Sequence, residues 1–128
     1  MQTILVVDDE FHIRSVVGTK LRGAGFAVVE AADAVEAFEV LAERAVDLVV
    51  TDYEMPGMNG LQMAIELARR PATARLPVVM LTARGNGIRD EDLAMTNVRV
   101  VESKPFSLRG LLAQLTKVLA ESGAAAGR

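Results

Sequence analysis

The sequence predicts a single α/β domain in which helices cover both faces of a parallel β-sheet. Two patterns alternate five times along the chain: a short apolar, β-branched run, and then a segment with apolar residues every three to four positions. Repeated units of this kind form parallel sheets, because each crossover helix returns the chain to the same edge. A chain of 128 residues, 51% of them hydrophobic, suits one core and is short for two.

Five apolar runs have the length and composition of β-strands. They comprise residues 3–7, 27–29, 48–51, 78–81 and 98–101. The first, third and fourth are continuously apolar, which is typical of strands with both faces buried. The second adjoins Glu30, and the fifth contains Arg99 and adjoins Glu102, so these two fit the edges of the sheet. We therefore expect a doubly wound, flavodoxin-like three-layer sandwich with strand order 2-1-3-4-5.

The segments that follow the strands carry helical spacing. Helices are expected, in chain order, around residues 13–21, 34–43, 61–68, 88–96 and 108–119. The last has the clearest apolar stripe, whereas the fourth is short and weakly patterned. We expect one domain over residues 1–122 and a flexible tail at residues 123–128, where glycine and alanine replace the periodic pattern.

Composition excludes several classes of protein. The net charge is −3, and the chain has no cysteine, so a disulfide framework, a thiol nucleophile and a cysteine-ligated metal are all excluded. An acidic domain without a basic tract is a poor candidate for direct nucleic-acid binding. No apolar run approaches the length of a membrane span, and the start of the chain lacks the features of a signal peptide. We expect a cytoplasmic protein.

Acidic residues follow two strands that are expected to be neighbours. Asp8 and Asp9 come directly after the first strand, and Asp52 follows the third. Carboxylates held close together repel one another, and a divalent cation relieves that repulsion. Oxygen ligands without cysteine suit Mg²⁺, which favours one or two carboxylates together with a phosphate. The alternative is that Asp8 and Asp9 are solvated loop acids, one of which caps the next helix.

Two further polar residues are expected at the same edge. Thr82 follows the fourth strand and Lys104 the fifth, and a hydroxyl and an ammonium group are what a phosphoryl group needs. Pro105 comes directly after the lysine, and an X-Pro bond can be cis or trans. The first loop is acidic where nucleotide-binding folds carry a glycine-rich loop, so no flavin or dinucleotide cofactor is expected.

In this pattern the chain resembles a response-regulator receiver domain of two-component signalling, of the chemotaxis-regulator type. The resemblance covers residues 3 to about 121. The motifs that carry it are Ile4-Leu5-Val6-Val7-Asp8-Asp9-Glu10, Asp52-Tyr53-Glu54-Met55-Pro56-Gly57-Met58-Asn59-Gly60, Leu81-Thr82-Ala83 and Lys104-Pro105-Phe106. Each motif alone is modest, but their order and spacing together are specific.

The resemblance implies a role for each site residue. Asp52 would accept a phosphoryl group from a kinase phosphohistidine. Asp9 and Asp52, with the backbone carbonyl of Glu54, would ligate Mg²⁺, and Asp8 would act largely through a metal-bound water. Lys104 would contact the acyl phosphate, and Thr82 would move toward it. Such a protein assists its own phosphorylation and dephosphorylation without being a turnover enzyme.

The resemblance also implies partners. These are a sensor histidine kinase or a phosphotransfer protein upstream, and downstream a protein target or an output domain. The downstream contact would use the face made by the fourth helix, fifth strand and fifth helix. A phosphorylation-dependent homodimer is one form that this contact can take. Neither nucleic acid nor a membrane is expected as a direct partner.

The chain departs from the family pattern at several positions. Many receivers have an aromatic residue three positions before the lysine, where this chain has Val101, and their usual Gly-Ala pair before the fifth strand is replaced by Thr96-Asn97. Two positions that often tune phosphoryl lifetime are Glu54 and Arg84. We hypothesise that these two side chains pair across the site; the alternative is that both are independently solvated.

Two other functions compete with the phosphorylated switch. One is a receiver fold that serves as a docking module largely independent of phosphorylation, which the missing aromatic residue favours and the intact acidic motif disfavours. The other is a phosphohydrolase with an aspartate nucleophile. Haloacid-dehalogenase-like enzymes carry Asp-x-Asp after the first strand, whereas here Asp8 and Asp9 are adjacent and the chain lacks a cap insertion.

Overall fold

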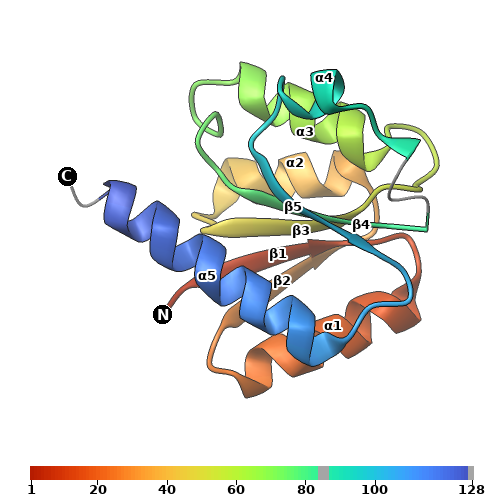
Figure 1. Ribbon diagram of the computed structural model, residues 1–128. Coiled ribbons are helices and arrows are strands. Elements are labelled where there is room, and N and C mark those ends of the chain that lie inside the picture. Colours follow the sequence, from red (N-terminus) through yellow and green to blue (C-terminus); the bar gives the residue numbers. More distant parts are fainter. Residues whose placement is uncertain (84–86, 127–128) are drawn as a thin grey trace.

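The computed structural model, which describes residues 1–83 and 87–126, has a five-stranded parallel sheet at its centre (Figure 1). The strands are β1 Thr3–Val7, β2 Ala27–Ala31, β3 Leu48–Asp52, β4 Val78–Thr82 and β5 Val98–Ser103. Their order is β2-β1-β3-β4-β5, so the expected topology is confirmed. The central strands β3 and β4 are buried along their whole length, whereas β2 and β5 are mostly half-buried, as expected for edges.

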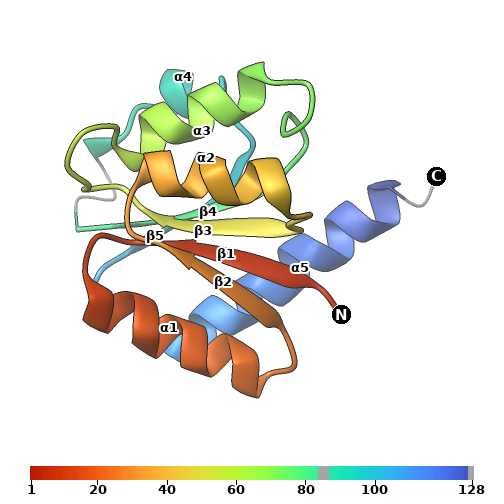
Figure 2. The same cartoon turned by 180° about the vertical axis from the view of Figure 1, so that it is seen from behind.

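Helices pack on both faces of this sheet. They are α1 Phe11–Gly23, α2 Ala34–Glu43, α3 Gly60–Arg69, α4 Asp90–Leu93 and α5 Leu108–Ala126. Figures 1 and 2 show α1 and α5 on one face and α2 and α3 on the other, with α4 beyond α3. The backbone of residues 123–126 continues α5, where a tail was expected. The domain boundary at residue 122 stays a prediction.

The core lies in two layers, because adjacent residues of a strand point to opposite faces. Ile4 and Val6 of β1 pack with α1 and α5, whereas Leu5 and Val7 pack with α2 and α3. Burial of each such side chain contributes about 1.5–3 kcal/mol, so both layers fix the position of the strand ends. Among the described residues, no helix is both long and apolar enough to cross a membrane.

Helix α4 has four residues, shorter than the expected span of 88–96. Its sequence is mostly acidic, so it offers little apolar surface to the core. The chain turns soon after its end, where the Thr96 hydroxyl donates to the Leu93 carbonyl at 2.7 Å and accepts from Val98 N–H at 3.1 Å. The Asn97 amide donates to the Arg75 carbonyl at 2.8 Å. The unusual Thr96-Asn97 pair therefore builds the turn that leads into β5.

Val101, which stands at the usual aromatic position, lies on β5. It is half-buried and packs against a cluster formed by Ala64, Met80 and Ile88. The β5 face near α4 thus carries a small aliphatic side chain, Val101, that packs against the core. The effect of this departure on the output face stays a prediction.

Candidate functional site

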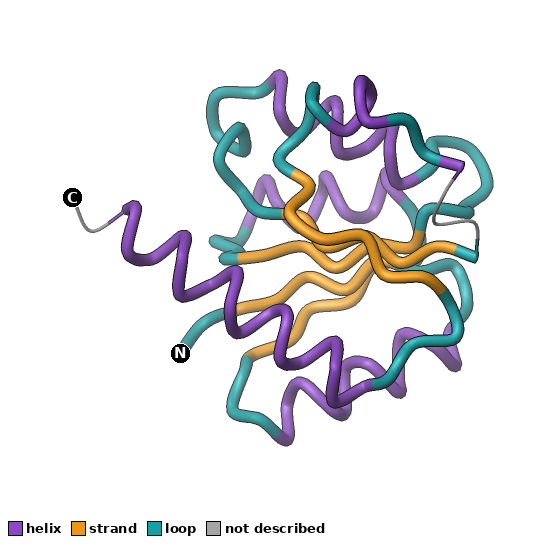
Figure 3. Tube along the Cα trace, in the orientation of Figure 1, coloured by secondary structure: helices purple, strands orange, loops and turns teal. Residues whose placement is uncertain are grey.

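All the residues singled out at strand ends lie at one edge of the sheet. Asp52 and Thr82 are the last residues of β3 and β4, and Asp8, Asp9 and Lys104 follow directly after β1 and β5. Because the strands are parallel, these ends meet, and Figure 3 shows the loops that follow β1, β3 and β5 on the same side. The structure therefore brings together the side chains that the sequence predicted, and we call this edge the mouth.

Three carboxylates form a compact cluster at the mouth. One oxygen each of Asp8, Asp9 and Asp52 lies within 4.8 Å of the others. Asp8 and Asp52 are both 2% exposed, whereas Asp9 is exposed to solvent. Burial raises the pKa of Asp8 from 3.8 to about 6, and the charges of Asp52 and Asp9 add to the rise although a backbone hydrogen bond opposes it. The cluster is thus a poor place for three negative charges without a cation.

Lys104 supplies one positive charge to this cluster. Its Nζ lies 2.9 Å from Asp52 Oδ1, and its backbone N–H donates to the Thr82 carbonyl at 2.8 Å. Burial raises the pKa of Asp52, although the hydrogen bond and charge of Lys104 act against that rise. Burial lowers the pKa of Lys104, but the Asp52 carboxylate, with the charges of Asp8 and Glu10, outweighs this effect and the net shift is upward. The Lys104-Pro105 bond is cis.

The loop that carries Asp8 is held by contacts from the N-cap and the first turn of α1. The carboxylate oxygen Oδ1 of Asp8 accepts from Glu10 N–H at 2.9 Å, and the Asp8 carbonyl accepts from Arg14 Nη1 at 2.7 Å. Arg14 Nε in turn donates to Glu30 of β2 at 3.3 Å. Sequence reasoning missed Arg14. Its position in the sequence could have indicated this contact, because Arg14 comes six residues after Asp8 and one helical turn into α1.

The carboxylate of Glu54 contacts the end of β4. Its Oε2 accepts from the Thr82 hydroxyl at 2.7 Å, and its Oε1 accepts from Ala83 N–H at 3.2 Å. Burial raises the pKa of Glu54, but these two hydrogen bonds, together with one to its own backbone and the charge of Lys104, hold the pKa below its usual value. Arg84, the partner hypothesised from sequence, lies outside the described residues, so that pairing stays a hypothesis.

The mouth fits a hard divalent cation. Asp8 Oδ2 is fully buried and accepts no hydrogen bond from the residues that the structure describes. A buried carboxylate oxygen of this kind is costly unless a donor or a cation satisfies it. Asp9 and Asp52 place further oxygens within reach of the same point. An all-oxygen set of this composition suits Mg²⁺.

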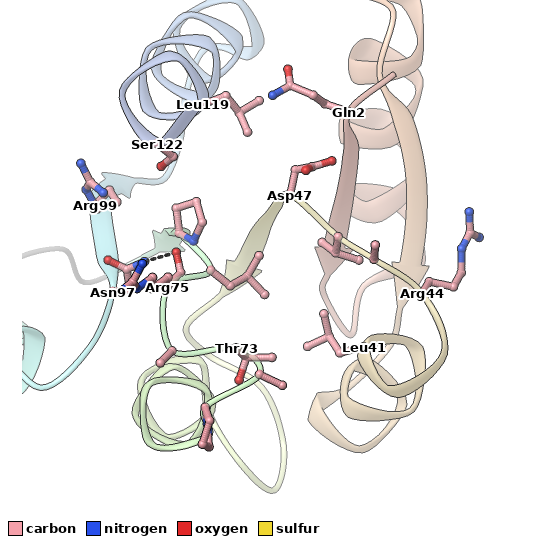
Figure 4. Close-up of a pocket in the computed structure, with 17 residues that line it drawn as sticks. Gln2, Leu41, Arg44, Asp47, Thr73, Arg75, Asn97, Arg99, Leu119 and Ser122 are labelled. Carbon is pink, nitrogen blue, oxygen red and sulfur yellow. Dashed lines mark hydrogen bonds between the residues drawn. The ribbon is translucent and has the colours of Figure 1, made fainter. Parts of the chain in front are cut away.

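A cavity of about 900 Å³ lies at the opposite edge of the molecule (Figure 4). Gln2, Asp47 and Asn97, which come just before β1, β3 and β5, contribute to its wall. None of the residues of the mouth lines it. The clustered carboxylates at the carboxyl ends of the strands are therefore separate from this cavity.

The fold and the carboxylate cluster define a receiver domain of two-component systems, and the chain belongs to this family. The family model for the response regulator receiver domain matches residues 4–116. Members of this family are generally not turnover enzymes, and they bind Mg²⁺ at an acidic pocket of this kind.

Individual relatives agree with this assignment. The chain is 37% identical to the phosphate regulon transcriptional regulatory protein PhoB of Pseudomonas aeruginosa, over 95% of this chain and 53% of the relative. It is 34% identical to the chemotaxis protein CheY-3 of Vibrio cholerae, over 90% of this chain and 89% of the relative. The chain thus spans about half the length of the phosphate-regulon relatives it matches.

Solved structures show the same architecture. The response regulator TrrA of Thermotoga maritima, in complex with Mg²⁺-BeF, has a TM-score of 0.81 and 30% identity, covering 91% of this chain and 98% of the other. The chemotaxis response regulator CheY4 of Vibrio cholerae has a TM-score of 0.84 and 29% identity, covering 92% and 98%.

Proposed function

We propose that this receiver accepts a phosphoryl group on Asp52 from a sensor histidine kinase or a phosphotransfer protein in a Mg²⁺-dependent reaction. The observation that carries the proposal is the position of Asp52. It is buried at the end of β3, lies 2.9 Å from Lys104 Nζ, and shares a 4.8 Å cluster with Asp8 and Asp9. A carboxylate with a cation on one side and clustered oxygen ligands on the other suits phosphoryl transfer better than solvation or core packing.

Each residue of the mouth has a defined part in this reaction. An Asp52 oxygen attacks the phosphorus, the bond from phosphorus to the donor's imidazole breaks, and the imidazole leaves with the electron pair. Lys104 stabilises the negative charge on the phosphoryl oxygens, and the Thr82 hydroxyl donates to one of them. Asp8, Asp9, Asp52 and the Glu54 carbonyl would hold Mg²⁺, which supplies positive charge to offset the carboxylates.

The signal then leaves through the surface made by α4, β5 and α5. Phosphorylation adds negative charge beside Thr82. This charge shifts the conformational equilibrium of the neighbouring loop, so a local change alters a distant surface. We infer that the recipient is a downstream protein or an output domain, with a phosphorylation-dependent homodimer as one arrangement. We further infer that the protein works in the cytoplasm and assists its own phosphorylation and dephosphorylation without multiple turnover.

The test is phosphorylation of the full chain by a small phosphodonor with and without Mg²⁺. We expect stoichiometric, acid-stable and base-labile labelling that needs Mg²⁺ and disappears in Asp52→Asn. The matched control is Asp47→Asn. Asp47 lies just before β3, at the opposite end of the strand from Asp52, and is exposed. Absence of labelling in the parent chain would support a phosphorylation-independent docking module, and multiple turnover of phosphoesters would support a phosphohydrolase.

A further inference from the structure

The Glu54 carboxylate accepts hydrogen bonds from two donors at the mouth. One oxygen accepts from the Thr82 hydroxyl at 2.7 Å, and the other accepts from Ala83 N–H at 3.2 Å. Thr82 is fully buried, whereas Glu54 is exposed and reaches over from the loop after β3. A single anionic group therefore bridges a side-chain donor and the next backbone donor at the end of β4.

These two donors lie beside the proposed phosphoacceptor. Asp52 pairs with Leu81 in the register of β3 and β4, and Tyr53 N–H donates to the Leu81 carbonyl at 2.8 Å. The end of β4 is thus held next to Asp52. A hydroxyl and an adjacent N–H are also the donors that an oxygen-rich anion prefers. A phosphoryl group on Asp52 and the Glu54 carboxylate would compete for the same two hydrogens.

We propose that the Glu54 carboxylate is an internal competitor of the phosphoryl group. It holds the Thr82 hydroxyl and the Ala83 N–H until phosphorylation displaces it, and it thereby weakens the affinity of this receiver for a phosphoryl anion. The inference rests on the proposed function of Asp52. It concerns the side chain of Glu54, which is distinct from the backbone carbonyl expected at the metal.

Charge repulsion adds to this competition. A phosphoryl group carries a charge of about −2 and presents three oxygens, so it repels a carboxylate held at the same donors. Displacement therefore costs two charge-assisted hydrogen bonds, which the phosphoryl group then remakes. A truncated side chain at position 54 removes this cost, and a neutral one of the same length reduces it.

The test uses beryllofluoride as the phosphoryl mimic and the full chain at saturating Mg²⁺. A Mg²⁺ titration of each variant comes first, so that changes in metal affinity are separated from changes in anion affinity. We expect Glu54→Ala to bind beryllofluoride about tenfold more tightly than the parent, and Glu54→Gln about threefold. The glutamine gains less because its amide oxygen still accepts one hydrogen bond.

The matched control is Glu10→Gln. Glu10 is an exposed acid at the same mouth, and its charge acts on Lys104, but it lies in the loop after β1. Removing its charge should change beryllofluoride affinity by less than about twofold. If Glu10→Gln and Glu54→Gln gained equally in beryllofluoride affinity, the gain would come from the loss of any negative charge near the site. That result would overturn the proposal. Glu54→Ala affinity no tighter than that of the parent would also overturn it.

A second measurement addresses the contact itself. In the Thr82→Val background the gain from Glu54→Ala should fall below about threefold, because one of the two contested donors is already gone. Amide hydrogen exchange at Ala83 without ligand should be faster in Glu54→Ala than in the parent. An undiminished gain together with unchanged exchange contradicts the competition. Failure of the proposed function would look different, since the parent itself would then bind no beryllofluoride and take no label on Asp52.

Discussion

The two halves of the mouth are built from different kinds of contact. In the metal half, formed by the ends of β1 and β3, the start of α1 fixes Asp8: the N–H of Glu10, its N-cap, holds the Asp8 side chain, and Arg14 holds the Asp8 carbonyl. In the switch half, formed by the ends of β4 and β5, Thr82 donates to an exposed side chain, Glu54, from a neighbouring loop. A metal site gains from ligands fixed in advance, whereas a switch needs contacts that can be exchanged.

The largest effect should come from moving the end of β3, which carries Asp52 into the metal half. A Cβ on Gly60 would lie 2.4 Å from the Asp52 carbonyl oxygen and 3.0 Å from Tyr53 Cα. These are backbone atoms, so the main chain must shift. We expect Gly60→Ala to lower the free energy of unfolding by about 2–3 kcal/mol and to weaken Mg²⁺ binding, both measured by urea denaturation with and without the ion.

Gly23 provides the matched control for this substitution. It also lies in a helix, at the end of α1, but a Cβ there meets nothing within 4 Å. Gly23→Ala should leave stability unchanged or raise it by up to about 1 kcal/mol, because alanine is the better helix former. Equal losses in the two variants would show that contact with the end of β3 is not the cause.

The next effect is the cost of burying the Asp8 carboxylate beside other negative charges, which Asp8→Asn removes. The folded-state pKa of Asp8, about 6, is above its usual value of 3.8, so the folded protein binds this proton more tightly than the unfolded chain. This contribution to stability is present below about pH 4 and is lost as the pH rises through about 6. In the absence of Mg²⁺, Asp8→Asn should therefore be about 2–3 kcal/mol more stable than the parent at pH 7.5, and nearly equally stable at pH 4.

The measurement is urea unfolding of both proteins in a chelator across this pH range. Asp9→Asn is the comparison, since Asp9 belongs to the same cluster but is exposed, and it should give a much smaller gain. Equal pH profiles for the parent and Asp8→Asn would contradict the argument from burial.

Mg²⁺ should stabilise the parent protein by relieving the same repulsion. At ten times its dissociation constant the ion should raise the free energy of unfolding by about 1.4 kcal/mol. Na⁺ at equal ionic strength serves as the control for general screening. An unfolding midpoint that is indifferent to millimolar Mg²⁺ would count against the metal half as described.

Sequence alone could predict the features that follow from hydrophobic periodicity and from the residues at strand ends. Apolar runs located the strands, charges near β2 and β5 marked these two as edges in agreement with the known doubly wound order, and residues at the carboxyl ends of parallel strands, such as Asp52 and Thr82, must meet. The contacts of long side chains could not be predicted in this way. The sequence did not indicate that the Glu54 carboxylate accepts hydrogen bonds from Thr82 and Ala83, since a flexible side chain can reach several donors; its hypothesised pairing with Arg84 stays untested. The short α4 was overestimated because its acidic residues leave little apolar surface to pack.

The β2 edge illustrates the same limit. Glu30 marked this strand as an edge because acids are rare in central strands. Its partners were not evident: it pairs with both Arg14 and Arg22 at 3.3 Å. Gly18 of α1 leaves room for this network, since a Cβ there would lie 3.3 Å from an Arg22 nitrogen and 3.5 Å from a Glu30 oxygen. A charge that identified an edge in the sequence is therefore also part of the support for the metal half.

The smallest expected effect separates the two arginines of this network. Arg14 and Arg22 both pair with Glu30, but Arg14 alone of the two donates to the Asp8 carbonyl, at 2.7 Å. Arg14→Gln should weaken Mg²⁺ binding about fivefold, slightly less than the usual loss of an outer-shell partner, because the shorter amide can still donate one hydrogen bond. Arg22→Gln should leave Mg²⁺ affinity within about 1.5-fold of the parent, since its side chain is half exposed.

Calorimetric titration of Mg²⁺ into each folded variant makes this comparison independent of general stability, which urea denaturation reports separately. Arg14→Lys should recover most of the lost affinity, because an ammonium group can still donate to the Asp8 carbonyl. Equal Mg²⁺ affinities for Arg14→Gln and Arg22→Gln would mean that the guanidinium merely joins α1 to β2. The fixed geometry of the metal half would then come from Glu10 N–H and the β1 backbone alone.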